Sequence, residues 1–350
     1  MQWAAGVEVK QASARSGQPN LLGHAPGAKA NMTPAKKQTT FERVFAHGDL
    51  LYRILLVASA VALIALIAGV GIMLWQASGA ARASAGAGFI TGERWNPSGG
   101  VFGALPFIAG TLLTSLIAVL IAVPFGLAIA IFLAELCPPA LRRPIGTMIE
   151  LLAAVPSVVY GLWGIFVFIP NFVKPIGNFL MNTFGAALPV FGGPFFGPSI
   201  FAAGVILAVM IIPTITSISR DVFLAIPSAQ REASFGLGAT QSETILRVLV
   251  PYGLSGILGA VILGLGRALG ETMAVTMTIG NVSQMPSSIL NAGYTMSSVI
   301  ANEWGEASSP VYSSALLEIG LLLFVVSLLL NLFARALVWS VSRRNPEQRS

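Results

Sequence analysis

Long apolar stretches, separated by shorter polar segments, dominate the chain. A transmembrane helix needs about 20 mainly apolar residues, and several stretches reach that length. They are continuously apolar and do not alternate with period two, which favours helices over the strands of a membrane β-barrel. We therefore expect an all-α integral membrane protein with six transmembrane helices. The predicted spans are about Leu50–Gln76, Pro106–Ala134, Ile145–Ile169, Ser199–Ile218, Pro251–Ile279 and Val311–Val338.

Composition and charge support a membrane protein and indicate its orientation. Of the 350 residues, 55% are hydrophobic and 10% are charged, whereas soluble domains carry about 25% charged residues. Lys and Arg concentrate in segments that face the cytoplasm. Of the 20 Lys and Arg residues, 16 lie on the side of the predicted N-terminus and three on the other side. Both termini are therefore expected in the cytoplasm, and the net charge of +6 is explained without a nucleic-acid partner.

This orientation defines the expected domains. Residues 1–48 are polar and lack an apolar period, so we expect a disordered cytoplasmic tail. Residues 49–340 form the transmembrane domain, and residues 341–350 form a cytoplasmic C-terminal tail. The single cysteine, Cys137, excludes an intramolecular disulfide. The two histidines are not accompanied by further metal ligands at a suitable spacing. No metal, cofactor or catalytic residue is expected.

Residues 219–250, between the predicted fourth and fifth spans, form a polar cytoplasmic segment. A Pro-Ser pair can start a first helix there, with Ser228 as a candidate cap. Gly238 follows in a glycine-containing bend, and Thr240 or the serine two residues later can cap a second short helix. Pro251 is expected to end the polar part. The alternative is an ordinary surface loop that joins two spans.

The predicted fifth span contains two charged residues, Arg267 and Glu271. A charge at the bilayer centre costs on the order of 3 kcal/mol, so such groups normally face protein or an aqueous path. Residues four apart lie on one face of a helix, and these two are expected to be close enough to pair. One interpretation is a structural ion pair. The other is an anion path, because guanidinium offers a forked set of donors to phosphate oxygens. The glycines of this span are expected to allow close helix packing.

The polar segment resembles the EAA loop of ABC-transporter permeases. The family pattern is Glu-Ala-Ala, three residues, Gly, nine residues, then Ile, any residue, Leu and Pro. This chain has Glu232-Ala233-Ser234, then Gly238, then Val248-Leu249-Val250-Pro251 at the same spacing, with Ser and two Val as departures. The resemblance implies that the segment docks into a groove on a separate ATPase subunit. The implied coupling residues are Glu232, Ala233, Ser234, Gly238 and Pro251.

Residues 267–275, with the sequence RALGETMAV, sharpen this resemblance. They are similar to the R-A-[IL]-G-E-T-M-A-V stretch of the C-type permeases of phosphate-specific ABC transporters. Trp95-Asn96-Pro97, Gly110-Thr111-Leu112 and the helix interrupted at Pro156 match as well, so the resemblance covers about Phe89–Arg344. It implies the six-helix fold of type I ABC-importer permeases (MetI-like). The implied translocation residues are Arg267, Glu271 and Thr272.

The resemblance also implies a function and partners. The chain is expected to be a permease subunit in a bacterial inner membrane, importing inorganic phosphate by ATP-driven alternating access. The implied partners are an A-type permease in a heterodimer, two ATPase subunits, an extracytoplasmic phosphate-binding protein and membrane lipid. The chain has no G-x-x-x-x-G-K-[ST] phosphate loop. We therefore expect a transport subunit and no ATPase activity of its own.

Three alternatives remain open at this point. A sulfate or molybdate permease would share the coupling loop but should lack the Arg-Gly-Glu-Thr-Met run. An ion-coupled secondary transporter would need no ATPase and usually shows inverted repeats with broken helices. A membrane scaffold would leave Arg267 and the EAA-like segment unexplained.

Overall fold

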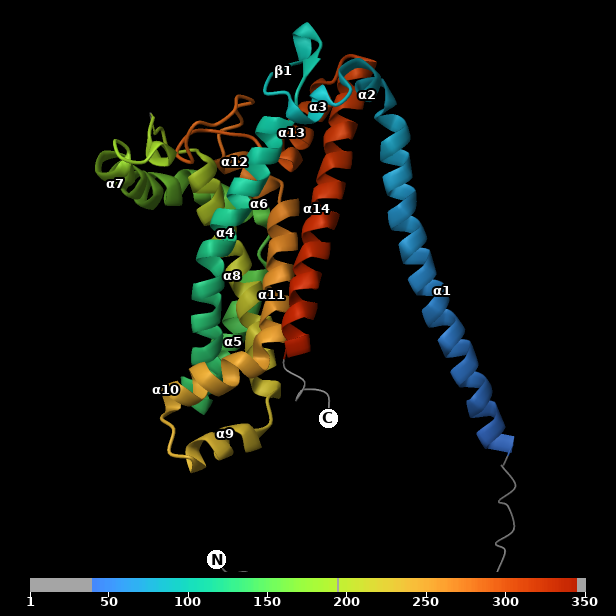
Figure 1. The fold of residues 1–350 in the computed structure, drawn as a ribbon, viewed down its shortest axis with the longest axis vertical. Helices are drawn as coiled ribbons and strands as arrows, with labels where there is room; N and C mark the ends of the chain where they lie inside the picture. Colours follow the sequence, from blue (N-terminus) through green and yellow to red (C-terminus); the bar gives the residue numbers. More distant parts are fainter. Residues whose placement is uncertain (1–39, 194, 345–350) are drawn as a thin grey trace, which may run out of the picture. The chain divides into compact units, whose positions relative to one another are not determined.

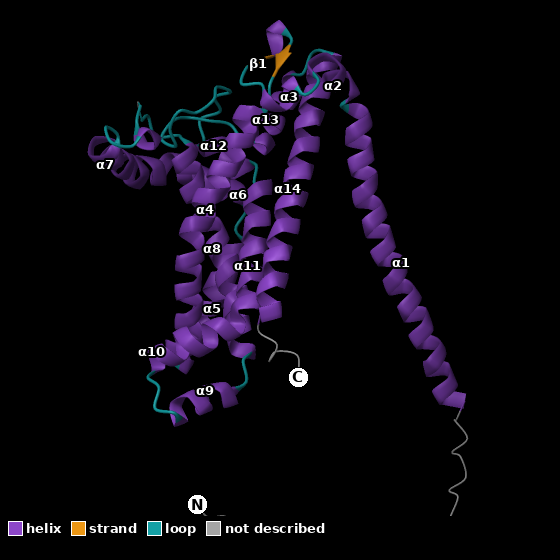
Figure 2. Cartoon of the chain, in the orientation of Figure 1, coloured by secondary structure: helices purple, strands orange, loops and turns teal. Residues whose placement is uncertain are grey.

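The computed structural model describes residues 40–193 and 195–344, and nearly all of them are helical (Figures 1 and 2). Most of the predicted N-terminal tail and the last six residues lie outside the described part. The α-helices are α1 (Thr40–Ala77), α2 (Gly79–Ala85), α3 (Gly88–Thr91), α4 (Leu105–Ile131), α5 (Pro139–Ala154), α6 (Ser157–Trp163), α7 (Lys174–Phe184), α8 (Ile200–Ala225), α9 (Ser228–Gly236), α10 (Gln241–Thr244), α11 (Val250–Gly270), α12 (Met273–Thr278), α13 (Met296–Glu303) and α14 (Pro310–Arg344).

Short irregular elements complete the described chain. The π-helical segments are Phe132–Leu136, Gly164–Val173 and Ile245–Leu249, and the 3₁₀ turns are Pro97–Gly99, Pro189–Phe191 and Trp304–Glu306. Strands β1 (Trp95–Asn96) and β2 (Val101–Phe102) form an antiparallel hairpin in which Trp95 lies opposite Phe102. The chain divides into two compact units within α1, between Ala62 and Leu63, and every other described element belongs to the second unit.

Within the described residues, six helices are long and apolar enough to cross a membrane, which confirms the six-span prediction. They are Tyr52–Ala77, Leu105–Leu136, Ser157–Phe184, Ile200–Ala225, Gln241–Gly270 and Pro310–Ser340. The first of these belongs to α1, which begins at Thr40. Residues 40–48, assigned to the tail from the sequence, are therefore helical in the structure.

The third span differs from the prediction of Ile145–Ile169. Helix α5 ends at Ala154, because Pro156 has no backbone N–H to donate and its ring disfavours a preceding helical turn. The membrane-crossing helix begins only at Ser157 and runs to Phe184. A π-helical segment within it accommodates Pro170. Part of the predicted loop after Ile169 is therefore helical.

The fifth span also differs from the predicted Pro251–Ile279, because it begins at Gln241 and ends at Gly270. The helical region continues from Gln241 through Pro251 to Gly270. Just before the proline the turn widens into π-helical geometry, in which the backbone N–H of Val250 donates to the carbonyl of Ile245. The wider turn accommodates a residue that cannot make the ordinary bond. Residues 241–250 of the polar segment and the membrane helix thus form one helical rod.

Helix α8 is the centre of the bundle, with 67% of its most apolar window buried. Small residues let its neighbours approach: Gly126 on α4 lies against Ile215, and Gly264 and Gly256 on α11 lie against Ile215 and Val222. The close-packing prediction is therefore confirmed for Gly256 and Gly264. A Cβ at Gly259 would meet no atom within 4 Å in this subunit.

The bundle of the second unit has two differently built ends, as Figure 1 shows. One, called the hairpin end here, holds β1, α2, α3 and α13. Trp95 is buried there against Phe102, Phe107 and Tyr312, and Glu303 Oε2 accepts hydrogen bonds from Trp95 Nε1 (2.8 Å) and the Tyr312 hydroxyl (2.6 Å). The opposite end, called the α9 end, holds α9, α10, the start of α5 and the end of α14.

Candidate functional site

A break between α5 and α6 leaves backbone carbonyls at the end of α5, those of Leu152 and Ala153 among them, without their usual helical partners. The carbonyl of Leu152 would accept from residue 156, which is a proline, and the carbonyl of Ala153 would accept from Ser157 across the break. Other groups satisfy them. The Tyr160 hydroxyl donates to Leu152 O (2.8 Å), and the guanidinium of Arg267 donates to Ala153 O from both terminal nitrogens (3.5 Å each).

A second break separates α11 from α12. Helix α11 ends at Gly270, and the backbone of Glu271 is extended, with φ −68° and ψ 131°. Glu271 Oε1 accepts from the backbone N–H of Ala274 (3.3 Å), which caps the start of α12. The Thr272 hydroxyl donates to Gly270 O (3.3 Å), and Ser297 Oγ donates to the carbonyl of Glu271 (2.7 Å). The Glu271 carboxylate and the Thr272 hydroxyl thus form their hydrogen bonds with the backbone at this break.

The predicted pairing of Arg267 with Glu271 is wrong. The prediction assumed a continuous helix, in which residues four apart share a face. Because the helix ends at Gly270, the Glu271 side chain turns to cap α12, and no ion pair within 4 Å joins the two residues. Arg267 is half-buried, and its described hydrogen bonds are the two long contacts with Ala153 O.

The two breaks are brought together by close packing of α6 on α12. A Cβ placed on Gly161 would lie 2.6 Å from Met277 Sδ and 3.2 Å from Ala274 Cα, so the absence of a side chain here allows the close approach. Non-helical backbone at membrane depth is tolerated where it is covered by protein or lines a cavity. The site therefore combines two interrupted helices with a guanidinium, a carboxylate and a hydroxyl. The guanidinium, whose donors are weakly engaged, and the hydroxyl can donate to an oxyanion.

The EAA-like segment forms a compact elbow of two helices at the α9 end. Helix α9 ends at Gly236, and Gly238 then adopts φ +84°, a left-handed conformation that glycine enters without steric cost. Thr240 and Glu243 form a reciprocal capping box that starts α10, which confirms the predicted cap. The predicted cap at Ser228 is wrong, because Pro227 is the N-cap and makes no side-chain hydrogen bond there.

The side chains of this elbow have different exposures. Glu232 and Ala233 are exposed, whereas Ser234 is buried and shares a hydrogen bond of 2.9 Å with the Thr244 hydroxyl. Two exposed apolar side chains on this elbow, Phe235 (49% exposed) and Leu237 (90% exposed), were not predicted from the sequence. They lie in the three-residue gap of the motif, and apolar residues in a polar segment were the signal that could have revealed them. Such a surface is typical of a protein-binding site.

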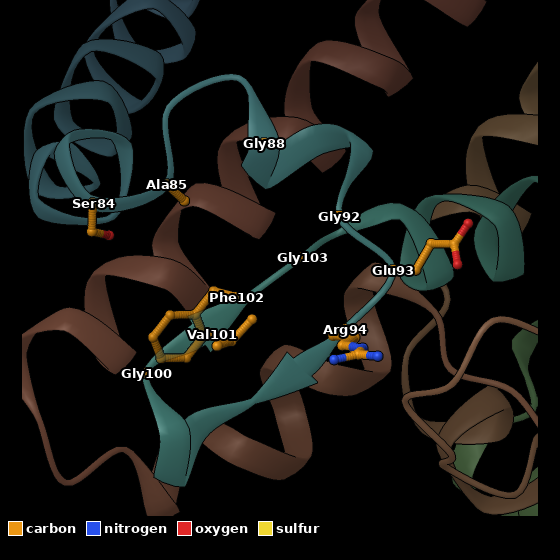
Figure 3. Close-up of a pocket in the computed structure, with 10 residues that line it drawn as sticks. All are labelled: Ser84, Ala85, Gly88, Gly92, Glu93, Arg94, Gly100, Val101, Phe102 and Gly103. Carbon is orange, nitrogen blue, oxygen red and sulfur yellow. The ribbon is translucent and has the colours of Figure 1, made fainter.

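A pocket of about 440 Å³ lies at the hairpin end, between α2, α3, residues 92–94 and strand β2. Small residues and backbone form most of its wall. Figure 3 shows Glu93 and Arg94 toward one side of it and Ser84 toward the other. The pocket therefore has one carboxylate and one guanidinium, and its other lining residues are uncharged. It lies at the opposite end of the bundle from the EAA-like segment.

The chain belongs to the family described as binding-protein-dependent transport system inner membrane components, whose model matches residues 122–343. Among its relatives, the phosphate transport system permease protein PstC of Mesorhizobium japonicum is 45% identical over 305 residues, covering 86% of this chain and 93% of that protein. The protein of the same name from Haemophilus influenzae is 43% identical over 306 residues, covering 86% of this chain and 94% of the relative.

Solved structures show the same fold. One chain of a bacterial alginate ABC transporter, in complex with an alginate pentasaccharide-bound periplasmic protein, matches with a TM-score of 0.54 at 19% identity. The match covers 83% of this chain and 94% of that chain. The predicted family, the all-α ABC-importer permease fold and the assignment as a transport subunit without ATPase activity are confirmed. The protein is a multi-pass membrane protein of a bacterial ABC importer.

Proposed function

We propose that this chain is the membrane-spanning permease of an ATP-driven importer of inorganic phosphate. The observation that carries the proposal is the likeness to phosphate transport system permeases, at 45% identity over 86% of the chain. It includes the segment in which Arg267, Glu271 and Thr272 surround a helix break. Transport proceeds by alternating access, with the site open first to one side of the membrane and then to the other.

The α9 end faces the cytoplasm in this proposal, and the hairpin end faces outward. The distribution of cations supports it. The segments at the α9 end carry Arg142, Arg143, Arg220, Arg231 and Arg247, whereas those at the hairpin end carry Arg82, Arg94 and Lys174. Both chain termini, including the tails 1–48 and 341–350, are then cytoplasmic.

Phosphate passes the crossing of the two broken helices. The Arg267 guanidinium attracts the anion and donates to its oxygens, exchanging two contacts of 3.5 Å for shorter charge-assisted ones. The Thr272 hydroxyl can turn from Gly270 O to a phosphate oxygen. The Glu271 carboxylate repels the anion and limits how long it stays, so that binding is weak enough for release.

The energy of ATP hydrolysis is transmitted to the permease at the α9 end. Two ATPase subunits supply it, and one of them receives the exposed surface of Glu232, Ala233 and Leu237. Gly238 sets the bend that presents this surface, Ser234 fixes the bend internally, and Pro251 lies in the rod that continues into the membrane. An A-type permease completes the path as the second half of a heterodimer, and an extracytoplasmic phosphate-binding protein delivers phosphate at the hairpin end.

Reconstitution tests this function. The complex of both permeases and the ATPase is placed in proteoliposomes, and uptake of radiolabelled phosphate is measured with binding protein, with and without ATP. We expect uptake only with ATP, and no competition by excess sulfate or molybdate. Uptake that follows a proton gradient without the ATPase would contradict the proposal, and complete inhibition by sulfate would assign a different oxyanion.

A further inference from the structure

An ion pair between Arg231 and Glu135 joins the first turn of α9 to the end of the second span. Arg231 Nη2 lies 2.7 Å from Glu135 Oε1, and Arg231 Nε lies 3.2 Å from both carboxylate oxygens. The pair is largely removed from solvent, with side-chain exposures of 21% for Arg231 and 12% for Glu135. A bidentate pair of this geometry fixes orientation as well as distance.

The remaining donors of Arg231 are used on α8. Nη1 donates to the carbonyl of Ile226 (2.8 Å) and Nη2 to that of Phe223 (2.8 Å). Both carbonyls lie at the C-terminal end of α8: Phe223 is in the last turn, where its carbonyl also accepts from the backbone N–H of Ile226 (3.3 Å), and Ile226 is the C-cap. Glu135 is engaged from α10 too, because Gln241 Nε2 donates to its backbone carbonyl (3.4 Å). Arg231 therefore holds the ends of α4, α8 and α9 in one arrangement.

The position of Glu135 determines which membrane span the ion pair connects to α9. It lies in the π-helical segment Phe132–Leu136, which closes the second membrane span. The hydrogen bond between Ser234 and Thr244 stays within the EAA-like segment, whereas the pair of Arg231 with Glu135 leaves it. On α9, Arg231 directly precedes the exposed Glu232 and Ala233. If the exposed face of α9 is displaced, the side chains of Arg231 and Glu135 transmit this displacement to the second span.

We propose that Arg231 and Glu135 are positioning residues for energy coupling: they make the second span follow α9 when the ATPase moves it. This inference rests on the proposed function. The continuous helical rod into the fifth span provides one connection between the coupling segment and the membrane, and this pair provides a second one to a different span. When the second and fifth spans move together, the site opens on one side of the membrane and closes on the other.

The test compares transport with ATP hydrolysis in the reconstituted complex. Arg231→Lys keeps the charge but cannot form the fork or reach both α8 carbonyls, and Glu135→Gln keeps the shape but removes the charge. We expect the ATPase to co-purify with both variants and to hydrolyse ATP, while phosphate imported per ATP falls at least about tenfold. Arg143→Lys is the matched control, because Arg143 is exposed at the same end and makes no described ion pair.

A variant that fails to assemble is replaced by the double variant Arg231→Met with Glu135→Leu. An apolar pair leaves no uncompensated buried charge and commonly preserves folding, but it lacks the directional link. A phosphate-to-ATP ratio equal to wild type in assembled variants overturns the inference, as does a fall in uptake that only matches a fall in bound ATPase. Absence of ATP-driven phosphate uptake by the wild-type complex contradicts the proposed function instead.

Discussion

Both terminal nitrogens of the Arg267 guanidinium lie 3.5 Å from the backbone carbonyl oxygen of Ala153. A charged group of α11 thus donates hydrogen bonds to the C-terminal end of α5. The contact exists because Pro156 removes the ordinary partners of the α5 carbonyls. Each hydrogen bond is long, near the limit of useful geometry. The arginine is therefore held in place by backbone and not neutralised by a carboxylate, which leaves its charge available to an anion.

Replacing Arg267 by alanine is expected to lower phosphate uptake roughly 10- to 100-fold, the range that follows from losing charge-assisted hydrogen bonds. Arg267→Lys should retain more activity, because it keeps the charge without the fork. Uptake by reconstituted complexes is the measurement, with Arg143→Ala as the control for removal of a cation. Normal uptake by an assembled Arg267→Ala complex would contradict a role of Arg267 in phosphate transport and would leave it a structural role only.

Exchanging the charges of Arg267 and Glu271 is expected not to restore transport. A true ion pair tolerates reversal better than either single change, but these residues do not pair and have different neighbours. An arginine at position 271 also cannot accept the hydrogen bond from the Ala274 N–H. We expect the double reversal to be at least as inactive as each single reversal in uptake assays. Recovery of uptake would show that the two side chains pair during the cycle.

Glu232→Lys is expected to weaken binding of the ATPase severalfold, because it reverses an exposed charge on the proposed docking face. Leu237→Asp should act in the same direction by placing a charge where an apolar side chain is 90% exposed. The measurement is the amount of ATPase that co-purifies with the permease. Glu93→Lys makes the same charge change at the hairpin end and should leave co-purification unchanged. Equal recovery with all three would argue against docking at α9.

Ser234→Ala is expected to destabilise the coupling segment although it restores the alanine of the EAA pattern. Thr244 is 1% exposed, and its hydroxyl would lose its partner, at a cost of about 1–3 kcal/mol. Replacing both residues, as Ser234→Ala with Thr244→Val, removes the unsatisfied group. The melting midpoint of the purified complex should fall in the single variant and recover in the double one. Additive losses in the double variant would contradict this role.

The number of spans could be predicted from the sequence because the length of a span follows from the thickness of the bilayer. The capping box at Thr240 was equally local, since its two side chains are three residues apart. The effect of the prolines was not local. Pro156 breaks its helix, whereas Pro251 does not, because the turn before Pro251 widens to π-helical geometry. Whether such a turn can widen depends on the packing around it.

The relation of Arg267 to Glu271 could not be predicted for the same reason. Spacing places residues four apart on one face only where the helix is continuous, and nothing between Arg267 and Glu271 resembles a breaking proline. The pair of Arg231 with Glu135 was out of reach as well. Its members are 96 residues apart, and only the packing of α9 beneath the second span brings them together. Long-range contacts of this kind are where a single sequence is least informative.

The continuous helix from Gln241 to Gly270 acts as a lever. Its 30 residues correspond to a length of about 45 Å, with the proposed ATPase-binding side at one tip and the Arg267 guanidinium near the other. If the rod tilts by roughly 5° about the α9 end, the far tip moves by about 4 Å. That displacement exceeds the 3.5 Å contact between Arg267 and Ala153 O. A small rocking motion at the membrane surface is therefore sufficient to detach the arginine from its carbonyl.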